Sequence, residues 1–134
     1  MAYIEWQQDY SVGVALIDEQ HKHFVGILNK LYETIQSAKT KELATITTEL
    51  VKYTKTHFDT EEKYFKEFKY EYTDEHIAEH KRLIGKVGEF LENNGENHLI
   101  RSFELLEFLE DWLVGHLATM DKSYTKCFNE HGLK

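Results

Sequence analysis

Five histidines and two carboxylates in this sequence fall at spacings that would surround a pair of metal ions. His57 and Glu61 are four residues apart, as are His76 and His80, and this spacing places both members of a pair on one face of an α-helix. Neutral imidazole binds iron, copper, nickel and zinc, and a carboxylate can bridge two cations through its two oxygens. Because the donors outnumber the four that a tetrahedral zinc ion needs, they predict two metal ions. The full set is His21, His57, Glu61, His76, His80, His116 and Asp121.

An isolated pair of histidines on a helix is more often a feature of a solvated surface than a metal site. Here, however, the pairs lie near the apolar stripes of their helices. His57 follows Leu50 and Tyr53, and His80 precedes Ile84 and Val87. Burying an imidazole without a partner costs about 1–3 kcal/mol. Two metal ions would satisfy all the buried donors at once, so the metal hypothesis is favoured.

Four helices are expected to position these donors. Proline is absent and glycine occurs 7 times, so little interrupts a long helix. Apolar residues three and four apart predict helices over about 19–38, 41–67, 73–93 and from 98 onward. Asn94 and Gly95 would end the third of these. Helices of similar length joined by short connections favour an all-α, up-down-up-down four-helix bundle.

The chain of 134 residues is expected to form a single domain, 1–134. Residues 1–18 form an apolar-rich N-terminal arm that we expect to pack across the bundle, residues 19–134. The apolar repeat also predicts the residues that face inward on the last two helices. They are Ile77, His80, Ile84, Val87 and Leu91 on the third, and Phe103, Leu106, Leu109, Leu113 and His116 on the fourth.

Helical register separates the two neighbouring acids of the second helix. Glu61 shares a face with His57, whereas Glu62 is rotated off it, so we expect Glu62 to face solvent. His116 and Asp121 break the four-residue rule, because five residues leave an ideal α-helix about 140° out of register. Either the helix widens between 117 and 120, or it ends there and a new turn carries Asp121. Wide turns of this kind are rare and frequently occur at functional sites.

Composition excludes several classes of protein. Lys and Arg total 16 against 24 Asp and Glu, a formal charge of -8, so nucleic-acid and anionic-membrane partners are not expected. No apolar run approaches the length of a membrane span, and no signal peptide is visible. The single cysteine, Cys127, excludes an internal disulfide and fits a reducing compartment. We expect a cytoplasmic protein.

These residues resemble the hemerythrin family, and the bacterial hemerythrins in particular. The resemblance covers nearly the whole chain, and each of the seven donor positions carries the residue type that the family pattern requires. The matching segments are Trp6, Ser11-Val12-Gly13-Val14, Asp18-x-Gln20-His21, His57-Phe58-x-x-Glu61-Glu62, His76-x-x-x-His80, Trp112-Leu113-x-x-His116, and Asp121 followed by Tyr124.

The resemblance implies two iron ions with an oxo or hydroxo bridge. One iron would be held by three imidazoles, from His76, His80 and His116, and the other by two, from His21 and His57. Glu61 and Asp121 would bridge them. This count leaves one open position, on the iron with two imidazoles, where dioxygen could bind. The apolar wall beside it, by the same resemblance, is Phe24, Phe58, Trp112, Leu113 and Leu117, for which ordinary core packing is the alternative interpretation.

The remaining polar residues have less specific interpretations. Tyr124 is either a hydrogen-bond donor to a bridging carboxylate or an ordinary buried tyrosine. His23, His98 and His131 lie outside the pattern and are expected on the surface. Cys127 is expected to be a small buried or half-buried group.

The leading functional hypothesis is a non-enzymatic protein that binds dioxygen for storage, delivery or sensing. The sequence does not identify a protein partner. The chain ends soon after the fourth helix, which favours a free-standing carrier. A di-iron enzyme that reduces peroxide or nitric oxide, or repairs iron centres, is the alternative. Oxygen-activating bundle enzymes use carboxylate-rich sites with Glu-x-x-His pairs, whereas this site would have five nitrogen ligands and two carboxylates. A purely structural bundle is the third possibility.

Overall fold

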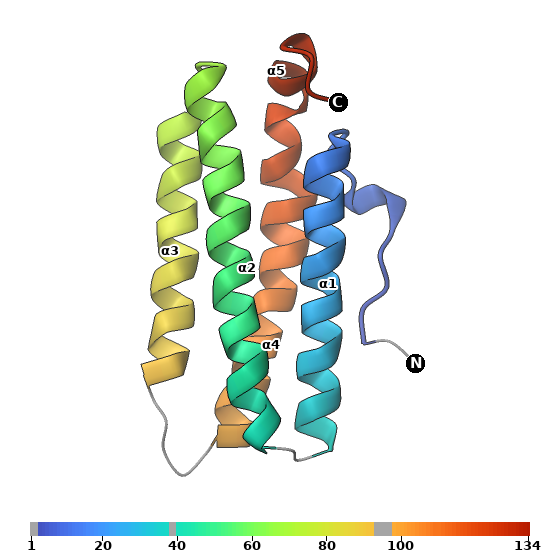
Figure 1. Cartoon of the computed structure of the whole chain (residues 1–134), viewed down its shortest axis with the longest axis vertical. Helices are drawn as coiled ribbons and strands as arrows, with labels where there is room; N and C mark the ends of the chain where they lie inside the picture. The colour runs from blue at the N-terminus through green and yellow to red at the C-terminus, as the bar shows by residue number, and fades with distance from the viewer. Residues whose placement is uncertain (1–2, 38–39, 93–97) are drawn as a thin grey trace.

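The computed structural model describes residues 3–37, 40–92 and 98–134. Successive long helices run in opposite directions along one axis (Figure 1), so the predicted all-α, up-down-up-down four-helix bundle is confirmed. The elements are η1 (Gln8–Tyr10), α1 (Ala15–Gln36), α2 (Thr40–Glu67), α3 (Thr73–Glu92), α4 (His98–Trp112), the π-helix η2 (Leu113–Met120), the 3₁₀-helix η3 (Asp121–Tyr124) and α5 (Thr125–Glu130).

The first helix starts at Ala15, about four residues earlier than the sequence analysis placed it, so the arm ends at residue 14. The apolar stripe of α1 begins with Ile17, which is fully buried. Asp18, in the first turn, ties the arm to the helix. Its carboxylate accepts hydrogen bonds from the Ser11 hydroxyl at 2.6 Å and from the backbone N–H of Val12 at 2.8 Å.

The arm lies alongside α1 (Figure 1). The backbone N–H of Ile4 donates to Asn29 Oδ1 at 2.8 Å, and Asn29 Nδ2 donates to the Ile4 carbonyl, also at 2.8 Å. Tyr3 donates a hydrogen bond from its hydroxyl to Glu110 of α4. The arm therefore connects α1 to α4, and its aromatic side chains pack against the bundle core.

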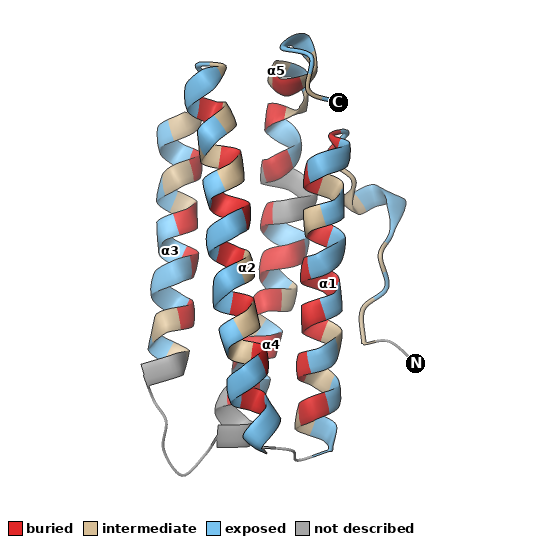
Figure 2. Cartoon of the chain, in the orientation of Figure 1, coloured by how far each residue is buried: buried red, intermediate tan, exposed pale blue. Residues whose placement is uncertain are grey.

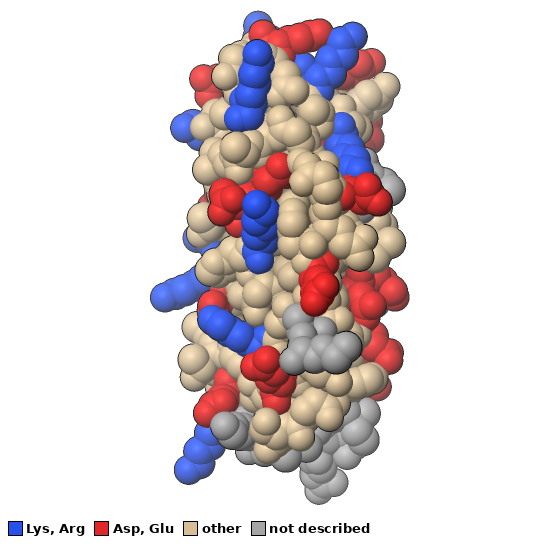
Figure 3. Space-filling model, turned by 90° about the vertical axis from the view of Figure 1, so that its right-hand side faces the viewer, with Lys and Arg blue, Asp and Glu red and all other residues tan. Residues whose placement is uncertain are grey.

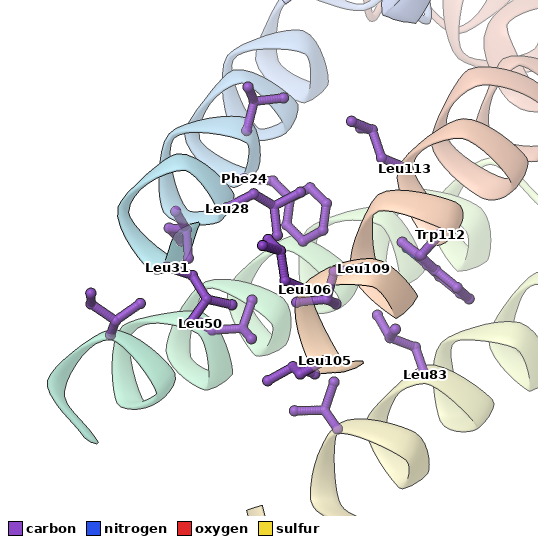
Figure 4. Packing of buried hydrophobic residues seen from close by; sticks show 14 of the residues in the cluster. Phe24, Leu28, Leu31, Leu50, Leu83, Leu105, Leu106, Leu109, Trp112 and Leu113 are labelled. Carbon is purple, nitrogen blue, oxygen red and sulfur yellow. The ribbon is translucent and has the colours of Figure 1, made fainter. Parts of the chain in front are cut away.

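The buried residues form stripes on the facing sides of the helices (Figure 2). Leucines dominate the core, which draws residues from all four long helices (Figure 4). A second cluster, rich in aromatic rings, lies at the end of the bundle where α1 begins and α5 is found (Figure 1). It consists of Val12, Val14, Ile17, Phe65, Tyr70, Tyr124 and Phe128.

Two of the residues expected on inward faces are exposed. On α3, Ile84 is 52% exposed, and its neighbour Leu83 is 2% exposed. On α4, Phe103 is 39% exposed, while Leu105, two residues further on, is 2% exposed. Nearby apolar residues compete for one stripe, and hydrophobicity alone does not decide between them. The Leu91 side chain and the Asn94–Gly95 stop signal lie outside the described residues.

The described surface carries charges of both signs. On the face turned to the viewer in Figure 3, acidic and basic side chains are interspersed. None of the described helices combines the length and the apolar character that crossing a membrane requires.

The corrected register of α3 predicts a sharp difference between neighbouring mutants. Leu83→Ala removes a buried side chain and should lower the free energy of unfolding by about 2–5 kcal/mol. Ile84→Ala removes an exposed one and should change it by less than about 1 kcal/mol. Urea denaturation of both variants, at equal metal content, checks this. A larger loss for Ile84→Ala would contradict the register of α3.

Candidate metal centre

The seven donors come from every long helix and converge in the bundle interior. His21 lies on α1, His57 and Glu61 on α2, and the next pair of histidines on α3. His116 lies in the π-helix, and Asp121 is the first residue of η3. Each of the seven is at most 4% exposed. Residues separated by up to 100 positions in the chain (His21 to Asp121) thus share one dry site.

Asp121 lies between donors from three helical segments. Its Oδ1 is 2.6 Å from His76 Nε2 and 2.9 Å from His116 Nε2. Its other oxygen, Oδ2, is 3.1 Å from His21 Nε2. Each carboxylate oxygen therefore faces a different set of imidazoles, an arrangement that suits a carboxylate bridging two cations.

Glu61 occupies a similar place between the other two histidines. Its Oε1 is 3.1 Å from His57 Nε2 and 3.1 Å from His80 Nε2. Overall the ligand atoms form two groups, within each of which every atom lies within 4.8 Å of the others, and the groups share Asp121. The groups are His76, His80, His116 and Asp121, and His21, His57, Glu61 and Asp121.

A π-helix resolves the five-residue spacing between His116 and Asp121. The spacing is compatible with a helix that widens or with one that ends there, and both occur. The chain widens into the π-helix over Leu113–Met120 and then tightens into the 3₁₀ turn that begins with Asp121. The i→i+5 pattern of a π-helix brings residues five apart closer to one face. The irregularity starts at Leu113, earlier than expected.

The unsatisfied donors of the site fit a metal centre. Among the described residues, both Glu61 oxygens, both Asp121 oxygens and the Nε2 atoms of His76, His80 and His116 are buried without a hydrogen bond of good geometry. Each such group costs about 1–3 kcal/mol when nothing pairs with it. Imidazole nitrogens and carboxylate oxygens that face one another are the donor set that divalent iron accepts.

The electrostatics of the site keep both carboxylates ionised. Burial and the Asp121 charge disfavour ionised Glu61, but His57 and His80 outweigh them and hold the pKa of Glu61 well below its usual range. For Asp121, burial is likewise overcome by His116, His21 and His76, so its pKa also lies well below the usual range. Two negative charges in a dry core favour the binding of cations.

The comparisons with known proteins agree with this geometry. A family model described as the hemerythrin HHE cation binding domain matches residues 12–127. The bacteriohemerythrin of Pseudomonas aeruginosa is 32% identical over 124 residues, which cover 92% of this chain and 80% of that protein. The bacteriohemerythrin of Methylococcus capsulatus is 28% identical over 130 residues, covering 96% of this chain and 99% of that one.

The chain belongs to the hemerythrin family. The crystal structure of a wild-type hemerythrin superimposes with a TM-score of 0.82 and 28% identity, covering 94% of this chain and 98% of that one. An alanine mutant of a hemerythrin gives a TM-score of 0.83. Hemerythrins bind dioxygen at a di-iron centre, and the two donor groups of this chain are able to hold two metal ions.

Two imidazoles of this hemerythrin are oriented by polar side chains behind them. His57 Nδ1 lies 2.6 Å from Gln20 Oε1, and Gln20 Nε2 donates to the Thr60 hydroxyl at 3.2 Å. His80 Nδ1 lies 3.0 Å from Glu62 Oε2. The expectation that Glu62 only faces solvent was therefore wrong. Its rotation off the His57 face takes it to the outer nitrogen of His80, leaving Nε2 to face the centre.

Aromatic rings stack on the faces of two imidazoles, those of His80 and His116. The Phe58 ring stacks on His80 with centroids 3.7 Å apart and an interplanar angle of 4°. Trp112 stacks on His116 at 4.0 Å and 16°. Because both rings are buried, they restrict the rotation of the imidazoles they cover.

An apolar cavity of about 10 Å³ adjoins His57, and so lies beside the group with two imidazoles. It has room for about one water-sized molecule. Of the wall predicted from the sequence, Phe24, Phe58 and Trp112 line it. Leu113 is fully buried in the same core (Figure 4) but does not line the cavity. The Leu117 side chain lies outside the described residues. Three further residues line the cavity that were not predicted from the sequence, namely Tyr53, Thr54 and Leu83.

The remaining candidates lie away from the ligand groups, except Tyr124. Tyr124 is fully buried, and burial together with the charges of Glu61 and Asp121 raises its pKa well above the usual value, so its hydroxyl is a donor beside the carboxylates. His23 and His131 are exposed, and Cys127 is half-buried. The side chain of the third surface candidate, residue 98, is not described.

The contact between Glu62 and His80 predicts a role in metal affinity. Removing the outer partner of a ligating histidine typically lowers metal affinity by about 10- to 100-fold. Glu62→Ala should therefore bind iron more weakly by that factor, measured by competition with a chelator. The matched control is Glu67→Ala, an exposed acid on the same helix. Equal affinities for the two variants would show that Glu62 does not position His80.

Proposed function

We propose that this chain binds dioxygen reversibly at two iron ions and serves in oxygen storage, delivery or sensing, without enzymatic turnover. One observation carries the proposal. Two buried donor groups share a carboxylate, and the group with fewer imidazoles adjoins an apolar cavity. Family membership supports the di-iron centre and the dioxygen ligand.

The proposed ligands of the first iron are the three imidazoles of His76, His80 and His116, and those of the second are His21 and His57. Glu61 and Asp121 would bridge the two ions, since each lies between imidazoles of both sets. When bound, the two ferrous ions supply the electrons for the reversible reduction of dioxygen. The ion held by His21 and His57 would have fewer imidazole ligands than the other and could take an exchangeable ligand.

The protein's own contribution is to hold the donors rigidly and to keep water away. All seven donors are at most 4% exposed. Phe24, Phe58 and Trp112 are each at most 4% exposed as well, and they close the cavity beside His57. A dry apolar wall limits the access of protons and anions, which favours release of the ligand unchanged over further reaction.

The nitrogen-rich donor set favours a carrier over an enzyme. Oxygen-activating bundle enzymes use Glu-x-x-His pairs, three residues apart, in carboxylate-rich sites. In this chain the pairs on α2 and α3 are four apart, and five imidazoles accompany two carboxylates. We therefore propose binding without turnover.

Reversibility is the property that tests this function. Protein reconstituted anaerobically with two ferrous ions per chain should develop a new visible absorption band in air. The band should disappear under vacuum and return on re-exposure through repeated cycles. Irreversible bleaching with turnover of added peroxide would instead indicate an enzyme, and failure to take up iron would indicate a structural bundle.

The ligand assignment predicts the effect of removing one donor. His80→Ala should abolish binding of at least one iron ion per chain, because it removes an imidazole that faces Glu61 at 3.1 Å. Iron content after reconstitution measures this, with His131→Ala as the control because His131 is exposed and lies outside both donor groups. Two irons per chain in His80→Ala would refute the assignment.

A further inference from the structure

The cavity beside His57 is not wholly apolar, because Tyr53 forms part of its wall. We propose that the Tyr53 hydroxyl donates a hydrogen bond to the small ligand that occupies this cavity, a diatomic or triatomic molecule with an acceptor atom, such as dioxygen or azide. This inference rests on the proposed function, and it makes Tyr53 a residue that sets ligand affinity and residence time.

The Tyr53 hydroxyl can donate a hydrogen bond to a ligand because it makes none within the described part of the protein. It is buried, and among the described residues nothing accepts its hydrogen bond. Buried hydroxyl groups are normally paired, so an unpaired one on a residue that lines a cavity indicates a partner that enters from outside. A phenol has an ordinary pKa of about 10, so at neutral pH the hydroxyl carries the proton that it would donate.

The tyrosine ring packs against the hydrophobic core and stacks on three other rings. Tyr53 lies one helical turn before His57, and their rings are nearly parallel at 7°, with centroids 5.6 Å apart. The outer ring of His23 stacks at 5.4 Å and 10°, and Phe24 at 5.6 Å and 26°. Tyr53 therefore lies against a proposed iron ligand and in the wall of the cavity beside it.

Tyr53 also borders a groove of about 460 Å³ on the outside of α1 and α2. The groove is lined by Leu16, Glu19, Gln20, His23, Glu49, Lys52, Tyr53 and Thr56. Tyr53 thus lies between this groove and the inner cavity. The competing explanation for its position is that its ring only controls the passage of a ligand from the groove into the cavity. Gating changes the rates of entry and exit together, whereas a hydrogen bond to the bound ligand acts on exit alone.

The test compares Tyr53→Phe with wild type and with Tyr64→Phe, a matched loss of a hydroxyl on the same helix outside the cavity. Azide is the probe for the oxidised di-iron protein, followed by its absorption change at equilibrium and by stopped flow. Tyr53→Phe should bind azide about 3- to 10-fold more weakly, the value of one hydrogen bond. The weaker affinity for azide should come from a faster dissociation rate, and the iron content should be unchanged. The oxygenated form should release dioxygen faster by a similar factor.

A second measurement needs no iron. Because the hydroxyl has no partner in the described protein, Tyr53→Phe should leave the melting temperature of the metal-free protein unchanged or higher. A lower melting temperature would show that the hydroxyl has a structural partner and would overturn the proposal.

The remaining outcomes separate this inference from the proposed function. If wild type binds azide and dioxygen but Tyr53→Phe has the same affinity as wild type, the hydrogen bond is refuted and the carrier function stands. Equal acceleration of association and dissociation would identify a gate and would also refute the donor role. If wild type with two irons binds neither ligand, the proposed function itself fails, and this inference fails with it.

Discussion

Asp121 is the side chain on which the geometry of the site depends, because its two oxygens face imidazoles of different groups. Oδ1 lies against His76 and His116, and Oδ2 against His21. The carboxylate is carried by the turn that follows the π-helix. A regular α-helix through this segment would rotate Asp121 away from His116. The wide turn is thus a local departure from regular structure that gives the two donor groups a common member.

The cost of burying so many polar groups explains why the site is surrounded by rigid packing. Two ionised carboxylates and five imidazoles would repel or remain unpaired in a loose core. Phe58 and Trp112 stack closely on His80 and His116. Gln20 contacts the outer nitrogen of His57, and Glu62 contacts that of His80. Preorganisation of this kind keeps the donors in place before a cation arrives.

The two sides of the site differ in what lies next to them. Beside His76, the aromatic rings of Phe65 and Tyr124 fill the space, with centroids 4.7 Å and 5.7 Å away. Beside His57 there is a small cavity with Tyr53 in its wall. The small apolar cavity therefore adjoins the group with fewer imidazoles.

The donors, the four helices and the need for an irregular turn near residue 117 were all predictable from the sequence, because each depends on local spacing along the chain. A four-residue interval in a helical segment decides which side chains share a face, and a five-residue interval breaks that rule. Only the tertiary structure decided between adjacent candidates such as Leu83 and Ile84, because both are apolar and the choice depends on how neighbouring helices pack. The same holds for Glu62 and Tyr53. Glu62 contacts His80 on another helix, and Tyr53 lines a cavity to which all four long helices contribute. The spacing of residues within one helix does not predict such contacts.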